Sequence, residues 1–293
     1  MTDKTDGVAG DPRLDALRKG MIASFWADAR PDQPAIISPH GHRTFAQLNA
    51  KANQLVRALR RRGLDPGDSI VLLCANRPEF AEVAAASQRS GLRLTPVNWH
   101  LTAEEASYIV ADCGAKVLIA DARFAETAVK AAHAPCVTVR LAVGGIIDGF
   151  EPYARMTSAE DAADIDDPIL GSAMLYTSGT TGRPKGVHRP RNVSETAVTA
   201  PIVASAQAAR EGPSMHLCTG PLYHTAPLAF SLAMPLAQGM SVVLMDGWEA
   251  GDTLRLIDQH RVTHTHMVPT MFHRLLSLPE DERESYNTSS LRY

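Results

Sequence analysis

The chain has 293 residues, of which 45% are hydrophobic and 21% charged, and its formal net charge is -3. This composition supplies enough apolar material for one large or two ordinary globular domains, and it excludes a disordered or fibrous protein. The slightly acidic balance provides no basic field for nucleic acid, and every apolar run is shorter than the ~18 residues of a membrane-spanning helix.

The cysteines and the N-terminal residues indicate the cellular compartment of the protein. The four cysteines are Cys74, Cys113, Cys136 and Cys218. None of them has CxxC spacing, and three lie in or beside apolar runs. We therefore expect buried free thiols and a reducing environment. Residues 1–12 are polar and acidic, unlike a signal peptide, and are expected to be disordered. Together these features predict a cytoplasmic protein.

In the first part of the chain, short apolar runs alternate with amphipathic helical patterns. A helical pattern near the N-terminus precedes a hairpin that turns at His40 and Gly41. Strands are then expected at 69–74, 92–97, 115–121 and 136–143, with helices between them. Continuous apolar strands that alternate with helices predict βαβ units and a parallel sheet covered on both faces.

Two of these helices carry start signals. Thr44 with Gln47, and Thr102 with Glu105, each form the spacing of a capping box. Gly63 is expected to end the first of the two helices.

The regular pattern lapses over an acidic, turn-rich stretch at 144–168 and then resumes. Further strands are expected at 169–176, 215–220, 241–246 and 262–268, with helices after Pro227, at 252–260 and at 269–278. The fold class is therefore α/β, with two stacked βα-type subdomains at 13–167 and 168–293.

A glycine-rich loop, LYTSGTTGRPKGV, occupies residues 175–187. Its glycines allow the backbone to curl around a ligand, while its hydroxyls and Lys185 supply donors and one cation, a combination suited to a polyphosphate. The loop is not a Walker A motif, because Pro184 and Gly186 flank the lysine.

The stretch TSGTTGRPKGV resembles the phosphate-loop signature of the adenylate-forming superfamily, which includes acyl-CoA synthetases. Four further segments resemble the family in the same order: residues 43–80, 91–121, 221–228 (PLYHTAPL) and 262–276 (VTHTHMVPTMFHRLL). The resemblance runs from about residue 30 to the end, and it implies the fold of the family's N-terminal region.

The resemblance also implies an activity. Family members join a carboxylic acid to AMP with release of pyrophosphate, and most then pass the acyl group to coenzyme A. ATP, Mg²⁺ and coenzyme A are thus implied, together with a fatty or similarly apolar acid. The open alternatives are a fatty acyl-AMP ligase and a non-catalytic nucleotide- or acyl-binding remnant, and a homodimer is left open as the assembly.

Site residues follow by position within the matching motifs. Lys185 and His224 are implied as catalytic residues, Thr177 as the residue near Mg²⁺, and His224, Val268 and Pro269 as substrate contacts. The implied contacts to ATP are Thr177, Ser178, Gly179, Thr180, Thr181, Gly182 and Lys185.

The sequence departs from the family at two places. Pro227 stands where the histidine block usually carries glycine. The resemblance therefore does not predict the local backbone conformation or the shape of the acyl pocket. The chain also ends where relatives continue into the remaining nucleotide-binding segments and a small C-terminal domain. We therefore expect an N-terminal portion, truncated before that domain, with little or no adenylating activity alone.

Two other clusters allow a ligand or a structural interpretation. His264 and His266 alternate on an expected strand, near His260 and His273, and would need a third partner to bind zinc. Trp99 follows a strand end, where α/β proteins often bind ligands, but it also suits a packing role.

Overall fold

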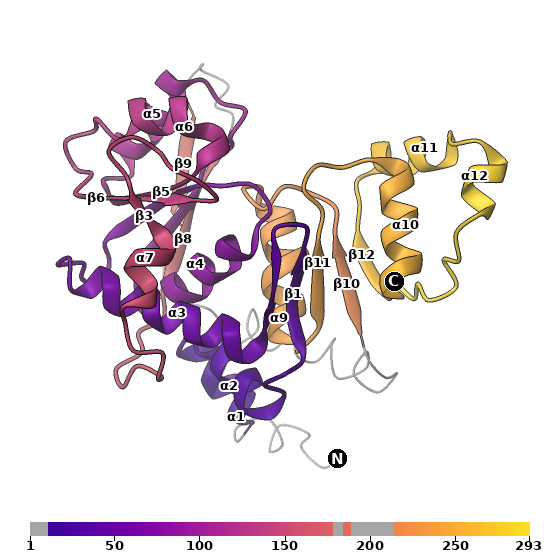
Figure 1. Cartoon of the computed structure of the whole chain (residues 1–293), viewed down its shortest axis with the longest axis horizontal. Coiled ribbons are helices and arrows are strands. Elements are labelled where there is room, and N and C mark those ends of the chain that lie inside the picture. Colours follow the sequence, from indigo (N-terminus) through magenta and orange to yellow (C-terminus); the bar gives the residue numbers. More distant parts are fainter. Residues whose placement is uncertain (1–10, 178–183, 189–213) are drawn as a thin grey trace, which may run out of the picture.

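The computed structural model describes residues 11–177, 184–188 and 214–293. Two β-sheets lie on either side of a central layer of helices, and further helices cover the outer face of each sheet (Figure 1). This arrangement confirms the α/β class predicted from the alternating pattern.

The seven-stranded sheet has the order β7-β6-β5-β3-β4-β8-β9 and is parallel except for the β8–β9 pair. Its strands are β3 (Ser69–Leu73), β4 (Arg93–Pro96), β5 (Ala115–Asp121), β6 (Val139–Val143), β7 (Glu151–Pro152), β8 (Ser172–Thr177) and β9 (Lys185–His188). In β3, Ile70 and Leu72 face the central apolar cluster, whereas Val71 and Leu73 face an outer one. Both faces of this sheet are therefore buried, as its continuous apolar strands predicted.

Helices cover both faces of the seven-stranded sheet. Residues of α3, α4 and α7 belong to the central cluster, and residues of α5, η1 and α6 pack on the outer face. The helices are α3 (Phe45–Arg60), α4 (Pro78–Arg89), α5 (Ala103–Asp112), η1 (Ala122–Phe124), α6 (Ala125–Ala131) and α7 (Tyr153–Ser158).

The five-stranded sheet has the order β12-β10-β11-β1-β2, parallel except for the β1–β2 hairpin. Its strands are β1 (Pro34–Ser38), β2 (Gly41–Thr44), β10 (Met215–Cys218), β11 (Ser241–Leu244) and β12 (His264–His266). The remaining helices are α1 (Pro12–Arg18), α2 (Ile22–Ala29), η3 (Pro227–Ala233), α9 (Met234–Ala237), α10 (Ala250–His260), α11 (Pro269–Leu276) and α12 (Glu280–Glu284).

The strand pairing does not follow the predicted division after residue 167. β1 pairs with β11 through Ile36 and Val242, although these residues lie far apart in the sequence. Conversely, β8 joins the seven-stranded sheet beside β4. The acidic stretch 144–168 therefore lies between β6 and β8 of one sheet and contains its edge strand β7. The sequence pattern did not reveal this, because sheet pairing depends on long-range contacts.

The predicted helix start signals are confirmed. The Thr44 side chain accepts a hydrogen bond from the Gln47 backbone N–H at 3.2 Å, and Gln47 Oε1 accepts one from the Thr44 N–H at 3.0 Å. Thr102 and Glu105 form the same pair of bonds at 3.3 and 2.8 Å. Gly63 follows α3 with a φ of 79°, as a left-handed helix end requires.

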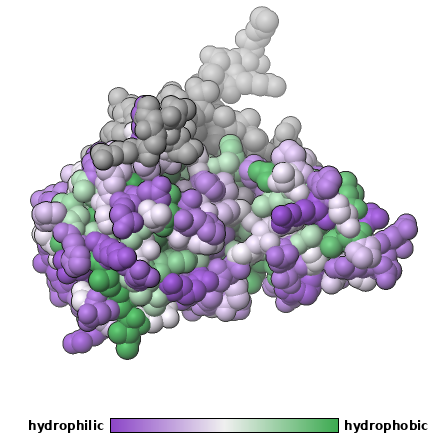
Figure 2. Space-filling view, turned by 90° about the horizontal axis from the view of Figure 1, so that it is seen from above, coloured by the Kyte–Doolittle hydropathy of each residue, from purple (hydrophilic) through white to green (hydrophobic). Residues whose placement is uncertain are grey.

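The surface seen in Figure 2 is largely hydrophilic, with hydrophobic atoms gathered in separate patches. Exposed apolar side chains at the α10–α12 end include Val268, Phe272 and Leu276. Among the described residues, no helix combines the length and apolar character needed to cross a membrane.

Candidate active site

The described ends of the glycine-rich loop lie on a two-stranded ribbon. β8 pairs with β4 only through Ser172 and Ala173, and beyond that point it pairs with β9. The register places Thr177 opposite Lys185, and both residues are exposed. The ribbon therefore brings the first hydroxyl of the motif and its lysine to the same end of the structure.

Tyr176 fixes this ribbon to the neighbouring helix. Its hydroxyl donates a 2.5 Å hydrogen bond to Asp112 Oδ2 at the end of α5. Gly186 lies opposite Tyr176, and a Cβ at this position would overlap the Met174 side chain and crowd the Tyr176 ring. A side chain at this position would require the Met174 methyl to move aside and the Tyr176 ring to shift slightly, so glycine eases the close approach of β9 to β8.

The facing wall comes from the five-stranded sheet. After β10 the chain makes a turn in which the His224 N–H donates to the Pro221 carbonyl at 3.1 Å. Pro227 then begins η3, a π-helical stretch, and the Leu228 N–H donates to the His224 carbonyl at 3.0 Å. The helical turn begins at Thr225, so Pro227 lies in its first turn, where its fixed φ suits the helix and its missing N–H is not needed. The departure at Pro227 is thus accommodated without breaking the segment.

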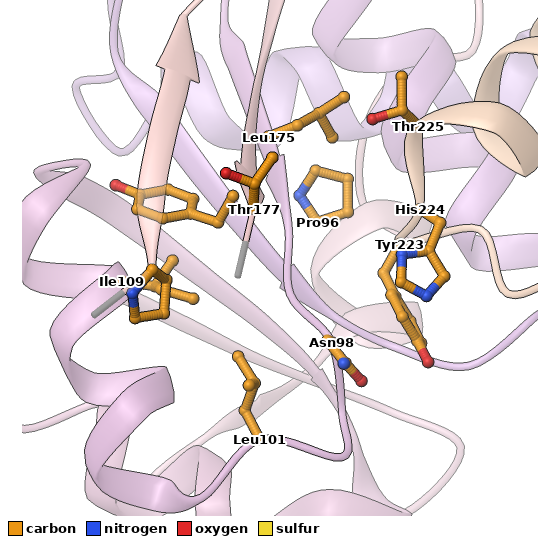
Figure 3. A pocket seen from close by; sticks show the side chains of 11 residues that line it. Pro96, Asn98, Leu101, Ile109, Leu175, Thr177, Tyr223, His224 and Thr225 are labelled. Carbon is orange, nitrogen blue, oxygen red and sulfur yellow. The ribbon is translucent and has the colours of Figure 1, made fainter. Parts of the chain in front are cut away.

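A pocket of about 340 Å³ separates the two walls. In Figure 3, Leu175 and Thr177 lie on one side and Tyr223 and His224 on the other. Its lining is mostly apolar or aromatic and consists of Pro96, Asn98, Leu101, Ile109, Leu175, Tyr176, Thr177, Pro184, Tyr223, His224 and Thr225. The pocket thus joins a polar rim at Thr177 to apolar walls, the arrangement that small-molecule sites commonly have.

His224 is the titratable side chain of this pocket whose state matters most. Partial burial lowers its pKa below the usual 6.5, because the charged imidazolium loses hydration there. At neutral pH the side chain is therefore an uncharged imidazole, which can donate one hydrogen bond and accept another.

The comparison with protein families shows to which family the chain belongs. A family model described as AMP-binding enzyme matches residues 24–293. The chain belongs to the AMP-binding enzyme family. Because the match includes both walls of the pocket, the ribbon and the His224 turn are both parts of the family's domain.

Relatives in this family are acid–thiol ligases of varied specificity. The chain is 31% identical over 278 residues to the feruloyl-CoA synthase of an Amycolatopsis species, covering 89% of the chain and 52% of the relative. It is 31% identical over 243 residues to the long-chain-fatty-acid–CoA ligase FadD13 of Mycobacterium tuberculosis, covering 81% and 46%. The chain thus spans about half the length of the curated relatives it matches.

Solved structures confirm the fold. The anthranilate CoA ligase AuaEII in complex with anthranoyl-AMP superposes with a TM-score of 0.80 at 23% identity, covering 94% of this chain and 54% of that one. The inhibitor-bound N-terminal domain of FACL13 from Mycobacterium tuberculosis gives a TM-score of 0.76 at 25% identity, covering 94% and 68%. The two-sheet architecture is therefore that of the N-terminal domains of adenylate-forming ligases.

The structure brings together some of the predicted site residues of this AMP-binding domain. Thr177 and His224 line one pocket, and Lys185 lies opposite Thr177 on the ribbon. The predicted phosphate contacts Ser178, Gly179, Thr180, Thr181 and Gly182 lie outside the described residues.

The other two predicted substrate contacts lie elsewhere. Val268 precedes α11 and is 47% exposed, and Pro269 is the first residue of that helix. Neither residue lines the pocket between Thr177 and His224. Their predicted role would therefore need a second surface, along the β12–α11 connection.

No metal centre forms within the parts of the chain that the structure describes. There, no group of three His, Cys, Asp or Glu residues lies close enough to hold an ion, and the predicted Mg²⁺ residue Thr177 offers a single hydroxyl. Mg²⁺ prefers several oxygen ligands, which the phosphates of ATP themselves provide.

Histidines of the five-stranded sheet lie on neighbouring strands and take part in its packing. His216 on β10 is in register with His264 on β12, and the His264 ring stacks on Tyr293 with centroids 5.1 Å apart. Burial, together with His264 and His266, lowers the pKa of His216 to about 3. His216 is therefore neutral in the folded chain.

Sequence reasoning missed Asn76 and left the role of Trp99 open. Trp99 stacks on Phe124 with centroids 5.3 Å apart and meets Tyr223 edge-on at 5.9 Å, so it supports the pocket wall by packing. Asn76 is a buried polar residue directly beyond the end of an apolar strand. An asparagine that follows an apolar strand was the sequence signal that could have indicated Asn76, because a buried side-chain amide must find hydrogen-bond partners.

Proposed function

We propose that the chain is the N-terminal portion of an ATP-dependent acyl-CoA synthetase that activates an apolar, preferably fatty, carboxylic acid as its acyl-adenylate. The observation that carries the proposal is the pocket that places Thr177 of the ribbon opposite His224. Membership of the AMP-binding family and the ligase relatives support the same activity.

The proposed chemistry requires positioning and charge stabilisation instead of a covalent enzyme nucleophile. The acid carboxylate attacks the α-phosphorus of ATP, the bond to the bridging oxygen breaks, and pyrophosphate leaves with the developing negative charge. Lys185 and the Thr177 hydroxyl, at the end of the ribbon, would stabilise that charge. Mg²⁺ bound to ATP would supply further positive charge when present.

His224 would act where the acid meets the nucleotide. Its neutral imidazole can donate a hydrogen bond to the carboxylate without the strong ion pair that a cation would form. Such a contact orients the attacking oxygen and still lets the carboxylate react. The acyl acceptor is proposed to be coenzyme A.

The apolar character of the substrate follows from the surroundings of His224. Leu175, Ile109 and Tyr223 line the pocket, and η3 continues from it toward Phe230, whose ring lies 5.6 Å from that of His266. An aromatic acid is the second candidate, because this ring pair offers a stacking surface and one relative is a feruloyl-CoA synthase.

Stable acyl-adenylate analogues test the proposal without turnover. We would titrate the chain with decanoyl- and feruloyl-sulfamoyl adenosine by calorimetry, and expect tighter binding of the decanoyl compound. His224→Ala should weaken analogue binding by roughly tenfold through loss of one hydrogen bond, and change ATP binding far less. In parallel, mass spectrometry should detect little acyl-adenylate formed from ATP and free acid by the chain alone.

If the chain binds neither analogue, the proposed activity is overturned. Tighter binding of the feruloyl compound would replace the fatty acid by an aromatic acid.

A further inference from the structure

Asn76 connects the two sheets beside the turn that carries His224. It lies just beyond β3 of the seven-stranded sheet and is 7% exposed. Its Nδ2 donates to the carbonyls of Gly220 and Met245, both at 3.0 Å, and its Oδ1 accepts from the Leu222 N–H at 2.9 Å. All three partners are backbone groups that follow β10 or β11 of the other sheet.

These partners adjoin the His224 turn. Gly220 and Leu222 precede Tyr223 and His224, and Gly220 lies so close to Pro227 that an added Cβ would be 2.6 Å from the proline ring. The turn is therefore a compact unit, and Asn76 holds it at its first residues.

Pro96 and Asn98, which also line the pocket, are fixed to the same point of the fold. β3 pairs directly with β4, and the Val97 N–H donates to the Leu72 carbonyl at 2.9 Å, so Pro96 and Asn98 are rigidly placed beside β3. Asn76 thereby sets the position of His224 relative to these two residues.

The chemistry selects asparagine at this position. Two buried carbonyls need donors and one buried N–H needs an acceptor, and a carboxamide supplies both from one planar group. Aspartate has no donor for the carbonyls, and serine is too short to reach all three groups.

We propose that Asn76 is a positioning residue that sets the separation between the His224 wall of the pocket and Pro96 and Asn98 beside the seven-stranded sheet. The inference rests on the proposed function for its consequence, which is correct alignment of acid and nucleotide. A misplacement of about 1 Å in such a site costs up to a hundredfold in rate.

Asn53 provides a matched control. It is equally buried, on α3, and its amide also makes three hydrogen bonds: to the Ala162 carbonyl, to Asp164 and from Arg89. Asn53→Ser should lose at least as much stability as Asn76→Ser, because two of the Asn53 partners are charged, but only Asn76→Ser should move a pocket wall.

Fluorine NMR of the chain labelled with 5-fluorotryptophan reads the wall directly, because Trp99 contacts Tyr223 edge-on at 5.9 Å. We expect the Trp99 resonance, assigned with Trp99→Phe, to shift in Asn76→Ser and to stay in place in Asn53→Ser. An unshifted Trp99 resonance in folded Asn76→Ser would overturn the inference.

Two further measurements complete the test. In the wild type, the Leu222 amide should exchange with deuterium as slowly as amides of β3, and fast exchange would contradict the proposal even if Asn76→Ser failed to fold. Decanoyl-sulfamoyl adenosine should bind Asn76→Ser about tenfold more weakly than Asn53→Ser, and equal binding would overturn the positioning role. If the wild type does not bind the analogue, the proposed function is refuted. The NMR shift would still decide the role of Asn76.

Discussion

In the seven-stranded sheet, both faces of the central strands are covered by apolar side chains, whereas the five-stranded sheet carries histidines on one face of its β10–β12 corner. The centre of the seven-stranded sheet is therefore held by burial of hydrocarbon. The His224 wall depends in addition on individual polar contacts, such as those of Asn76 and of Arg123, which pairs with Asp246 at 2.7 Å. This difference indicates a rigid platform that faces a wall whose position a few side chains determine.

The largest expected effect concerns the platform. Leu72 on β3 is fully buried in the central cluster, so Leu72→Ala should lower the free energy of unfolding by about 2–5 kcal/mol through lost burial and a cavity. Urea denaturation measures this loss, with Ile146→Ala at a 91% exposed position as the control. A change below ~0.5 kcal/mol for Leu72→Ala, the usual surface value, would contradict a platform held by burial.

A smaller, pH-dependent effect is expected on the histidine face. The pKa of His216 is lowered from 6.5 to about 3, so the unfolded chain takes up a proton before the folded chain does. The stability that the fold gains by keeping His216 neutral is fully present above pH 6.5. It is lost as the pH falls toward 3. Between about pH 7.5 and pH 4.5, wild type should lose about 2–3 kcal/mol more than His216→Asn.

Urea denaturation at the two pH values checks this prediction, and Leu72→Ala is the reference, because its effect should be similar at both. Parallel pH profiles of wild type and His216→Asn would show that His216 is not buried as a neutral side chain.

Local features of the fold were predictable, and long-range ones were not. The capping boxes at Thr44 and Thr102 depend on residues three positions apart, so the sequence alone revealed them. The pairing of β1 with β11 joins segments separated by the whole seven-stranded sheet, and no local period encodes it.

The same difference between local and long-range features applies to the residues of the candidate site. Thr177, Lys185 and His224 were accessible through their motifs, and the structure places Thr177 and His224 on facing walls of one pocket. Asn76 was missed because its partners are backbone groups of Gly220, Leu222 and Met245, which no side-chain motif marks.

The central claim is that the end of the β8–β9 ribbon holds the polyphosphate of ATP. Calorimetric titration of Mg²⁺–ATP into the 293-residue chain and into Lys185→Ala tests it most directly. The account predicts binding by wild type and affinity lower by about tenfold or more in the variant, because a charge-assisted contact to phosphate is lost. Equal affinities, or no binding by wild type, would contradict it.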